Sequence, residues 1–273
     1  MPKHQPKAQP DALYGINAVK EAIGKRPMEY VLVTAGHHGP RVQEVIDACR
    51  AKGISLRFAP QPALERVAGT AQHQNVVAIC SAKAYDNLET LISVAERLLL
   101  VVLDGVEDPA NLGAIVRTAT AAGAHGVVIP ERRAAGLSPA VARAAAGALE
   151  HMRIARVTNL VRALVELKQR NIWVYGFEAS APKSYLDLDC TVACALVLGG
   201  EGHGLHRLVR EACDEVGHIP LYGPVQSLNV SVASAVVLYE AARQRHRTLT
   251  VERTEDTSST YSNASPPRTG RSS

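Results

Sequence analysis

The sequence predicts an α/β protein in which a small α/β domain precedes a larger α/β domain built on a parallel sheet. Short apolar runs alternate with helical patterns, a polar stretch separates two such series, and 47% of the 273 residues are hydrophobic, enough for real cores. Strands that alternate with helices pair in parallel and bind ligands at their carboxyl ends. We expect a disordered leader, a first domain, a linker, a second domain and a disordered tail over 1–11, 12–82, 83–94, 95–248 and 249–273.

The elements are predicted from the spacing of apolar residues. In the first domain, helices are expected at 16–23, 41–51 and 63–68, and strands at 30–33, 54–58 and 76–80. In the second domain, strands separated by helical patterns are expected at 98–103, 126–129, 172–175, 195–198 and 216–219. The run at 98–103 is far too short to cross a bilayer, so it predicts a strand buried on both faces.

Composition indicates a cytoplasmic protein with no membrane segment. The polar, proline-rich start lacks the apolar segment of a signal peptide. The cysteines are sparse and odd in number, which favours a reducing compartment; they are Cys49, Cys80, Cys190, Cys194 and Cys213. A net charge of +4 allows an anionic partner. A local basic cluster faces only Glu131 and Glu150, and is either a phosphate footprint or a set of solvated helix faces; it comprises Arg132, Arg133, Arg143, Arg153 and Arg156.

The first candidate motif, 104–118, follows the strand at 98–103. Asp108 can cap a helix, Pro109 suits its first turn, and Gly123 is placed to end it. Its buried stripe is predicted to be Leu112, Ile115, Val116 and Ala119. Asn111 and Arg117 then lie near the catalytic end of a strand, with Arg117 above Gly113, whose missing side chain leaves room for a ligand. The alternative is a capping asparagine and a solvated arginine.

The second motif, 195–205, runs from a strand into a glycine-rich turn before a helix at 206–213. Glycines let backbone amides approach a ligand closely. An ordinary turn explains the glycines but not Glu201 among them. The spacing differs from that of a dinucleotide fingerprint, which disfavours a nucleotide-dependent dehydrogenase. His203 and His206 have no third ligand at a recognisable spacing, so no metal site is predicted.

The third motif, 219–231, leads into a helix that extends to about residue 245. Ser227 is a natural cap for this helix. Its buried stripe is predicted to be Leu228, Val232, Ala235, Val236 and Tyr239. An ordinary capped helix leaves the polar series Ser227, Asn229 and Ser231 unexplained.

In this order and with these separations, the three motifs resemble those of the SpoU (TrmH-like) branch of the SPOUT RNA methyltransferases. The segments 14–19 and 73–78 also resemble the small RNA-binding domain of the bacterial group that methylates a guanosine ribose of 23S rRNA. The resemblance covers about Leu13 to about Arg247. Asn75 departs from the glycine usual in that group, His203 occupies a variable position, and the Ser/Thr-rich tail is additional.

The resemblance implies a SPOUT domain with a parallel sheet and a trefoil knot, an exception to the rule that chains do not thread themselves. It implies an L30e-like RNA-binding domain in front of it, a homodimer, and RNA rather than DNA as partner. It implies S-adenosyl-L-methionine as cofactor, with Gly199, Ile219 and Leu228 as matching binding positions, and we add their neighbours Leu198, Gly200 and Leu221.

The implied reaction is 2′-O-methylation of RNA. A ribose hydroxyl is a poor nucleophile, so the protein must position it and draw its proton away. The implied catalytic residue is Arg117, which as a permanent cation is better suited to stabilising a developing alkoxide than to acting as a base. The residues implied to orient it and the ribose are Asn111, Glu201, Ser227 and Asn229. Alternatives are methylation of tRNA or of an rRNA adenosine, and an RNA-binding or ribosome-assembly protein without catalysis.

Overall fold

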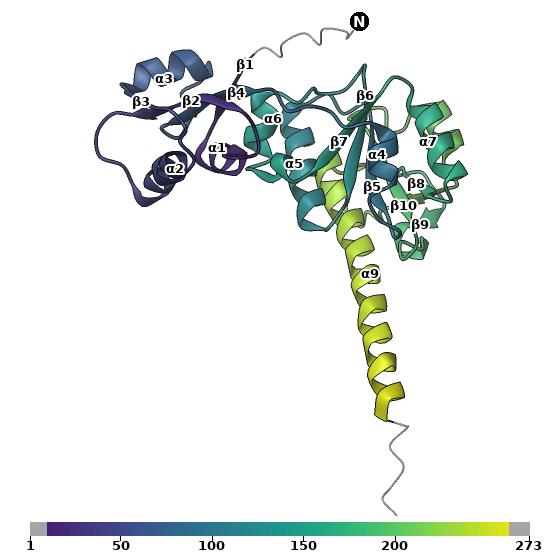
Figure 1. Cartoon of the computed structure of the whole chain (residues 1–273). Coiled ribbons are helices and arrows are strands. Elements are labelled where there is room, and N and C mark those ends of the chain that lie inside the picture. Colours follow the sequence, from purple (N-terminus) through teal and green to yellow (C-terminus); the bar gives the residue numbers. More distant parts are fainter. Residues whose placement is uncertain (1–9, 262–273) are drawn as a thin grey trace, which may run out of the picture.

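A computed structural model describes residues 10–261, with side chains described as far as residue 246, and Figure 1 shows their arrangement. The strands form a four-stranded sheet in the order β1-β4-β2-β3 and a seven-stranded sheet in the order β7-β6-β5-β10-β8-β11-β9. All pairings in the larger sheet are parallel. The predicted α/β class is therefore confirmed.

The first sheet and its helices are close to the prediction. In chain order the elements are β1 (Pro10–Tyr14), α1 (Ile16–Ala22), β2 (Met28–Thr34), α2 (Pro40–Ala51), β3 (Leu56–Ala59), α3 (Gln61–Ala68) and β4 (Val76–Ser81). The sequence analysis missed β1 because it assigned residues up to 11 to the leader. Antiparallel pairing with β4 gives this segment backbone partners, and a proline at the first residue of an edge strand removes no ladder bond that the sheet needs.

The second sheet contains every predicted strand and two that were not predicted. Its elements are α4 (Leu88–Ile92), β5 (Leu99–Asp104), α5 (Pro109–Ala121), β6 (Gly126–Pro130), α6 (Pro139–Ala144), the 3-10 turn η1 (Ala148–Glu150), β7 (Arg153–Val157), α7 (Leu160–Gln169), β8 (Trp173–Phe177), β9 (Lys183–Ser184), the 3-10 turn η2 (Tyr185–Asp187), β10 (Cys194–Gly199), α8 (Arg207–Ala212), β11 (Glu215–His218) and α9 (Val230–Tyr261). The strands β7 and β9 were missed because both lie at sheet edges, where charged side chains interrupt the apolar pattern.

Helices cover both faces of this sheet. On one face, alternate side chains of β5 pack with α5, α6 and α9, and on the other face they pack with α4, α7 and α8. All six residues of β5 are buried, which confirms that this strand is covered on both sides. The segment expected as a linker contributes α4 to the second face, where Asn87 caps the helix by accepting a hydrogen bond from Thr90 N at 2.7 Å.

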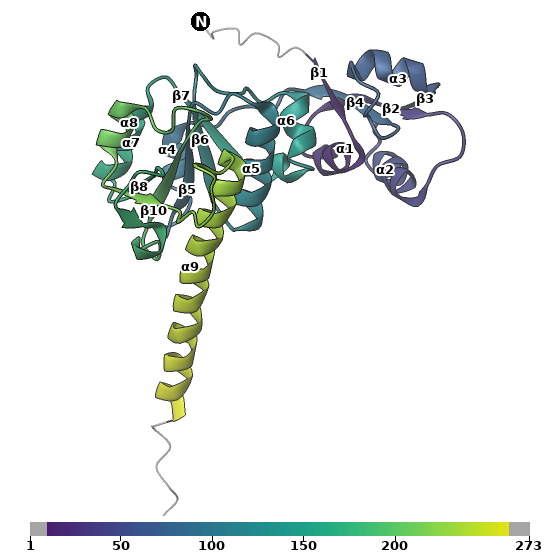
Figure 2. The same ribbon diagram turned by 180° about the vertical axis from the view of Figure 1, so that it is seen from behind.

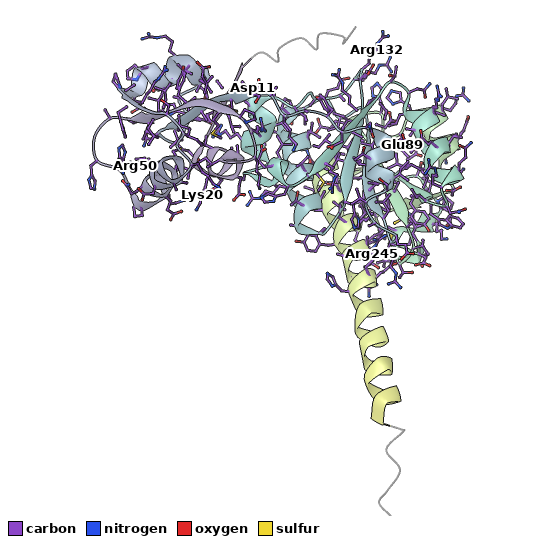
Figure 3. The ribbon with its side chains drawn as sticks, in the orientation of Figure 1. Asp11, Lys20, Arg50, Glu89, Arg132 and Arg245 are labelled. Atoms are coloured by element: carbon purple, nitrogen blue, oxygen red, sulfur yellow. The ribbon has the colours of Figure 1, made fainter. Side chains whose placement is uncertain are left out.

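The long C-terminal helix α9 is anchored at the amino ends of β5 and β10. The guanidinium of Arg245 donates to the carbonyl oxygens of Leu98 at 2.9 Å and Cys190 at 2.7 Å (Figure 3). Beyond this anchor the helix continues to Tyr261 and projects from the body of the molecule (Figure 1). The helix includes 249–261, which the sequence assigned to the tail, and adding residues to an existing helix costs far less than starting one. Residues 262–273 lie outside the described part of the chain. Among the described helices, none is long and apolar enough to span a membrane.

The two sheets are joined through a packed junction between α1 on one side and α6 and η1 on the other (Figures 1 and 2). Arg26 and Glu150 form a two-point ion pair in it, with Arg26 Nε donating to Glu150 Oε2 at 3.0 Å and Arg26 Nη2 donating to Glu150 Oε1. Their side chains are only 7% and 4% exposed. Apolar residues of both sheets form one continuous buried cluster around this region. The junction is therefore a core-like contact.

The turn 73–75 of the first domain also faces this junction. Gln74 Oε1 accepts a hydrogen bond from Ile16 N at 3.0 Å, and Gln72 Oε1 accepts one from Arg143 of α6 at 2.6 Å. Asn75 has a φ of 66°, in the left-handed region where glycine is usual and asparagine is tolerated. The departure at Asn75 thus keeps the turn conformation that a glycine would adopt.

We expect Glu150→Ala to destabilise the protein strongly. The substitution leaves the Arg26 guanidinium buried without its partner, which costs about 3–5 kcal/mol. Thermal or urea unfolding should therefore show a large loss of stability. Lys20→Ala is the control, because the pair of Lys20 with Glu44 is 45% and 55% exposed and such pairs contribute about 1 kcal/mol or less. Equal effects of the two substitutions would contradict a structural role for the buried pair.

Candidate functional site

The site forms where β5 and β10 end side by side in the larger sheet. These strands pair in parallel, and their register sets Gly199 opposite Asp104. The first and second motifs follow directly from these two strand ends, so they meet at one edge of the sheet. The third motif returns to the same edge between β11 and α9. The backbone topology therefore brings the three motifs to one edge of the sheet, as the sequence predicts.

The start of α5 has the predicted local structure. Both carboxylate oxygens of Asp108 accept backbone hydrogen bonds, from Ala110 N at 3.1 Å and Asn111 N at 3.2 Å, and Pro109 begins the helix. The helix ends before Gly123, whose φ is 79°. The predicted stripe is fully buried and consists of Leu112, Ile115, Val116 and Ala119. This packing fixes Asn111 in the first turn, with only 8% of its surface exposed.

Asn111, Glu201 and Asn229 form one hydrogen-bonded cluster, with one residue from each motif. Asn111 Nδ2 donates to Glu201 Oε1 at 2.5 Å. Asn229 Nδ2 lies 3.1 Å both from Asn111 Oδ1 and from Glu201 Oε1. Three of the five predicted catalytic positions are therefore in direct contact with one another.

Asn229 also starts the last helix. Its Oδ1 accepts hydrogen bonds from Ser231 N at 2.8 Å and Ser231 Oγ at 2.5 Å, immediately before α9 begins. The prediction of Ser227 as the cap was wrong: residues 228 and 229 lie outside the helix, and Asn229 takes the capping position. Because the cap holds Oδ1, the amide nitrogen of Asn229 is directed at Glu201. Ser227 lines the nearby cavity.

The glycine-rich turn allows two backbones to approach closely. A Cβ on Gly200 would lie 1.9 Å from the carbonyl oxygen of Gly105, and one on Gly199 would lie 2.1 Å from the backbone of Gly204. Gly200 N donates to Asp104 O at 2.7 Å, which extends the β5–β10 pairing beyond the strands. Only glycine fits at these two positions, and the turn they form presents Glu201 to Asn111.

A cavity of about 540 Å³ opens beside this cluster. Every predicted cofactor-binding position lines it, together with Glu201, Ser227 and Asn229; these positions are Leu198, Gly199, Gly200, Ile219, Leu221 and Leu228. The sequence analysis missed Phe177, Glu178 and Ser180, which line it from the end of β8. Because β8 pairs in parallel with β10, its carboxyl end opens on the same edge, and the predicted strand 172–175 ended too early to indicate this.

Arg117 does not reach this cavity. Six residues beyond Asn111, it lies about 9 Å further along the α5 axis and about 120° around it. Its side chain is exposed, and within the described part of the chain it lines neither of the two cavities beside the cluster. Gly113 is buried and offers no room to a ligand, because a Cβ there would lie 2.4 Å from Ala144 Cβ. The interpretation of Gly113 as ligand space was wrong: it permits close packing of α5 on α6.

A second cavity of about 680 Å³ shares Gly200, Glu201 and His203 with the first and is also lined by Asn111. Its wall contains a hydrogen-bonded series that the sequence analysis did not find. Asp104 accepts from His206 N at 2.8 Å and lies 3.0 Å from His206 Nδ1. His206 Nε2 in turn lies 3.2 Å from Arg133 Nη1. The sequence places Asp104 in the first motif, Arg133 in the basic cluster and His206 beside the glycine-rich turn, but no local pattern joins residues of separate segments.

The predicted basic cluster is divided among different environments. Arg143 donates to Gln72 across the domain junction, and Arg156 lies over the Tyr85 ring at 5.2 Å. Arg132, Arg133 and Arg153 are exposed. The five arginines therefore do not share one environment, and Arg133 lies on the second cavity.

The buried thiols have no chemical role at this edge of the sheet. All five cysteines are free, and none of them lines either cavity. Burial raises the pKa of Cys213 to about 12 and that of Cys49 to about 11. Both groups are therefore protonated near neutral pH and serve as small apolar side chains.

A parallel α/β sheet with a ligand-sized cavity at its carboxyl edge, walled by a Gly-Gly-Glu turn and a Ser-Leu-Asn segment, defines a class of ligand-binding domain that known proteins share. The profile of the SpoU rRNA Methylase family matches residues 98–239, and that of the RNA 2′-O ribose methyltransferase substrate-binding domain matches residues 12–86. The chain therefore belongs to the SpoU rRNA methylase family, and it is an RNA methyltransferase.

The similarity extends over nearly the whole chain. YacO of Bacillus subtilis, assigned to the TrmH family of tRNA/rRNA methyltransferases, is 44% identical and covers 87% of this chain and 97% of its own length. The 23S rRNA (guanosine-2′-O-)-methyltransferase RlmB of Xanthomonas campestris is 42% identical, with 85% and 96% covered. The SpoU methyltransferase AviRb of Streptomyces viridochromogenes, solved in complex with AdoMet, has a TM-score of 0.74 at 27% identity, with 86% and 90% covered.

We expect Gly200→Ala to open the contact between the two strand ends. The new methyl group would overlap the Gly105 carbonyl, so the turn must move, at a cost of about 1–3 kcal/mol for such overpacking. Unfolding experiments should show this loss, and ligand binding in the first cavity should weaken. Gly223→Ala is the matched control, because a Cβ there has nothing within 4 Å. If the two variants behave alike, the close approach does not support the site.

Proposed function

We propose that this protein transfers a methyl group from S-adenosyl-L-methionine to the 2′-hydroxyl of a guanosine ribose in 23S rRNA. The observation that carries the proposal is the Asn111–Glu201–Asn229 cluster, which lies between a cavity for a methyl donor and a second cavity open to a substrate. The guanosine and 23S rRNA assignment is supported by the RlmB relatives.

The first cavity fits the proposed cofactor. Its volume of about 540 Å³ is within the range of small-molecule sites, and apolar side chains of Leu198, Ile219 and Leu228 can hold an adenine ring. Glu201 adds negative charge that suits the cationic sulfonium and ammonium groups, whereas Glu178 on the same wall is paired with Arg210 at 2.7 Å. When bound, the cofactor supplies an activated electrophilic methyl group. AviRb and an rRNA methyltransferase of Sinorhizobium meliloti have been solved with AdoMet bound.

The residues of the cluster position the ribose. Glu201 Oε1 is held by two amide donors, so the carboxylate has a fixed orientation. Within the described part of the chain, its Oε2 accepts no hydrogen bond, and it can accept one from the ribose hydroxyl. Ser227 adds a hydroxyl on the cavity wall, where it can orient the ribose. Such fixed partners align the ribose oxygen for in-line transfer of the methyl group. This alignment lowers the part of the activation barrier that comes from bringing the two reactants into position.

Arg117 does not reach the cluster within one copy of the chain, so the proposal includes a homodimer that would bring this cation to the site. The face of α9 expected to be buried is only partly covered: Val232 is 50% exposed and Tyr239 is 56% exposed. The helix α9 packs beside α5, which carries Arg117 (Figure 2). Pairing of two copies through this layer would cover the apolar stripe and bring Arg117 of one copy toward the cluster of the other. The predicted cytoplasmic location and the predicted trefoil knot remain part of the proposal.

Incubation with labelled S-adenosyl-L-methionine and 23S rRNA should place a methyl group on a guanosine ribose. Arg117→Ala should lower kcat by about 100-fold or more, because stabilisation of the developing alkoxide is lost. Calorimetry should show nearly unchanged cofactor affinity, since Arg117 lies outside the first cavity. Transfer to tRNA or to an adenosine would change the substrate that we assign. If Arg117→Ala transfers methyl groups as fast as the wild-type protein, Arg117 has no catalytic role.

Mixing two inactive variants should restore activity if Arg117 acts across the dimer. In a mixture of Arg117→Ala and Asn229→Ala, half of the dimers are mixed, and one of the two sites in each combines Asn229 from one copy with Arg117 from the other. About a quarter of the wild-type activity should then return. Light scattering on Val232→Glu should show loss of the dimer. A mixture with no more activity than its components would assign Arg117 to its own subunit or to no catalytic role.

A further inference from the structure

The second cavity holds one side chain whose orientation is fixed but whose hydrogen-bonding capacity is mostly unused. We propose that Arg133 binds an RNA phosphate beside the target ribose, and that Asp104 and His206 position its guanidinium for this contact. The inference rests on the proposed function, because it assumes that the ribose lies at the cluster formed by Asn111, Glu201 and Asn229. It assigns a role to Arg133 and His206, which lie outside the three motifs, and to Asp104 at the start of the first motif.

The hydrogen bonds run from a buried carboxylate to an exposed cation. Asp104 is 6% exposed at the end of β5, and its two oxygens are held by the backbone and ring nitrogens of His206 at 2.8 and 3.0 Å. With Nδ1 donating to Asp104, a neutral His206 has an acceptor at Nε2, which faces Arg133 Nη1 at 3.2 Å. Among the side chains described, through residue 246, a single donor of the guanidinium is thereby engaged, and the others are available to a ligand.

The backbone around Arg133 is also constrained. Arg133 has a φ of 57°, an uncommon conformation for a residue with a side chain, in the loop between β6 and α6. Two residues later, Ala135 N donates to Val106 O at 2.9 Å, which ties this loop to the segment that follows β5. The loop therefore holds Arg133 over the same strand end that carries Asp104.

Arg133 is the side chain on the wall of the second cavity that can bind an anion. The carboxylates of Asp104 and Asp108 are engaged by His206 and by the first turn of α5. Within the described part of the chain, Arg133 forms no ion pair, and it is the only lysine or arginine that lines this cavity. Glu107 and Glu201, also on the wall, disfavour an anion elsewhere in the cavity.

The chemistry of the substrate supplies that anion. The 2′-hydroxyl is on C2′, and the neighbouring C3′ carries the oxygen that bears a phosphate, so RNA that presents its ribose to the cluster also brings a phosphate into reach. Arginine matches phosphate oxygens with paired donors, and such contacts fix the register of a nucleic acid. A base edge is the other group that Arg133 could contact, and the experiment below separates the two.

Equilibrium binding to a synthetic fragment of 23S rRNA, selected by affinity, tests the contact without requiring transfer. We expect Arg133→Ala to weaken binding about tenfold and to reduce the slope of log Kd against log salt by about 0.7–0.9, the value for one lost phosphate contact. Arg132→Ala is the matched control, because it removes the same charge from the neighbouring position, which does not line the cavity; Figure 3 labels Arg132 on its loop. His206→Ala should weaken binding in the wild-type background and add nothing in Arg133→Ala.

A single neutral methylphosphonate linkage, placed in turn at each side of the methylated nucleotide, identifies the partner. At the correct linkage, wild-type protein should lose about tenfold in affinity and Arg133→Ala should lose nothing more. A base substitution that cancels the effect of Arg133→Ala, or equal effects of Arg132→Ala and Arg133→Ala, would overturn the proposal. If wild-type protein shows this coupling but transfers no methyl group, the contact stands and the proposed function fails.

Discussion

The parallel pairing of β5 with β10 is the constraint on which the rest of the site depends. It continues past the strands because Gly200 N donates to Asp104 O, and because two glycines let the chains approach where any side chain would overlap backbone. This contact brings Glu201 to Asn111, and Glu201 lines both cavities. A mobile glycine turn could not hold a carboxylate in one orientation, so the close packing converts flexible residues into a rigid support.

The same principle applies at the end of the chain. Asn229 ends the third motif and begins α9, so its side chain serves both the helix and the cluster. The helix is fixed in turn by Arg245, which reaches the carbonyl oxygens at the amino ends of β5 and β10. Site geometry therefore depends on contacts at both ends of the sheet. Residues far from the cavities, including the buried pair of Arg26 and Glu150, stabilise the domains in which that geometry is built.

The sequence was most informative where one local pattern determined the structure. The stripe of α5, its Asp108 cap and the buried strand β5 follow from periodicity and helix capping, and each is confirmed. Prediction failed where long-range packing decided. The reason for Gly113 is the approach of α6, the environment of Arg133 depends on Asp104 and His206 from other segments, and β1 exists because β4 pairs with it. None of these contacts leaves a periodic signal in its own segment.

The exposed stripe of α9 shows how a failed burial prediction can be informative. Val232 and Tyr239 follow a helical spacing that is typical of a buried face, yet both are about half exposed in the single chain. Arg117, on the helix packed beside α9, is likewise outside both cavities. Pairing of two copies through this layer would explain both observations, because it would cover the apolar residues of α9 and bring Arg117 toward the cluster of the other copy. The catalytic unit would then be the dimer, and the sequence pattern of α9 would describe its interface.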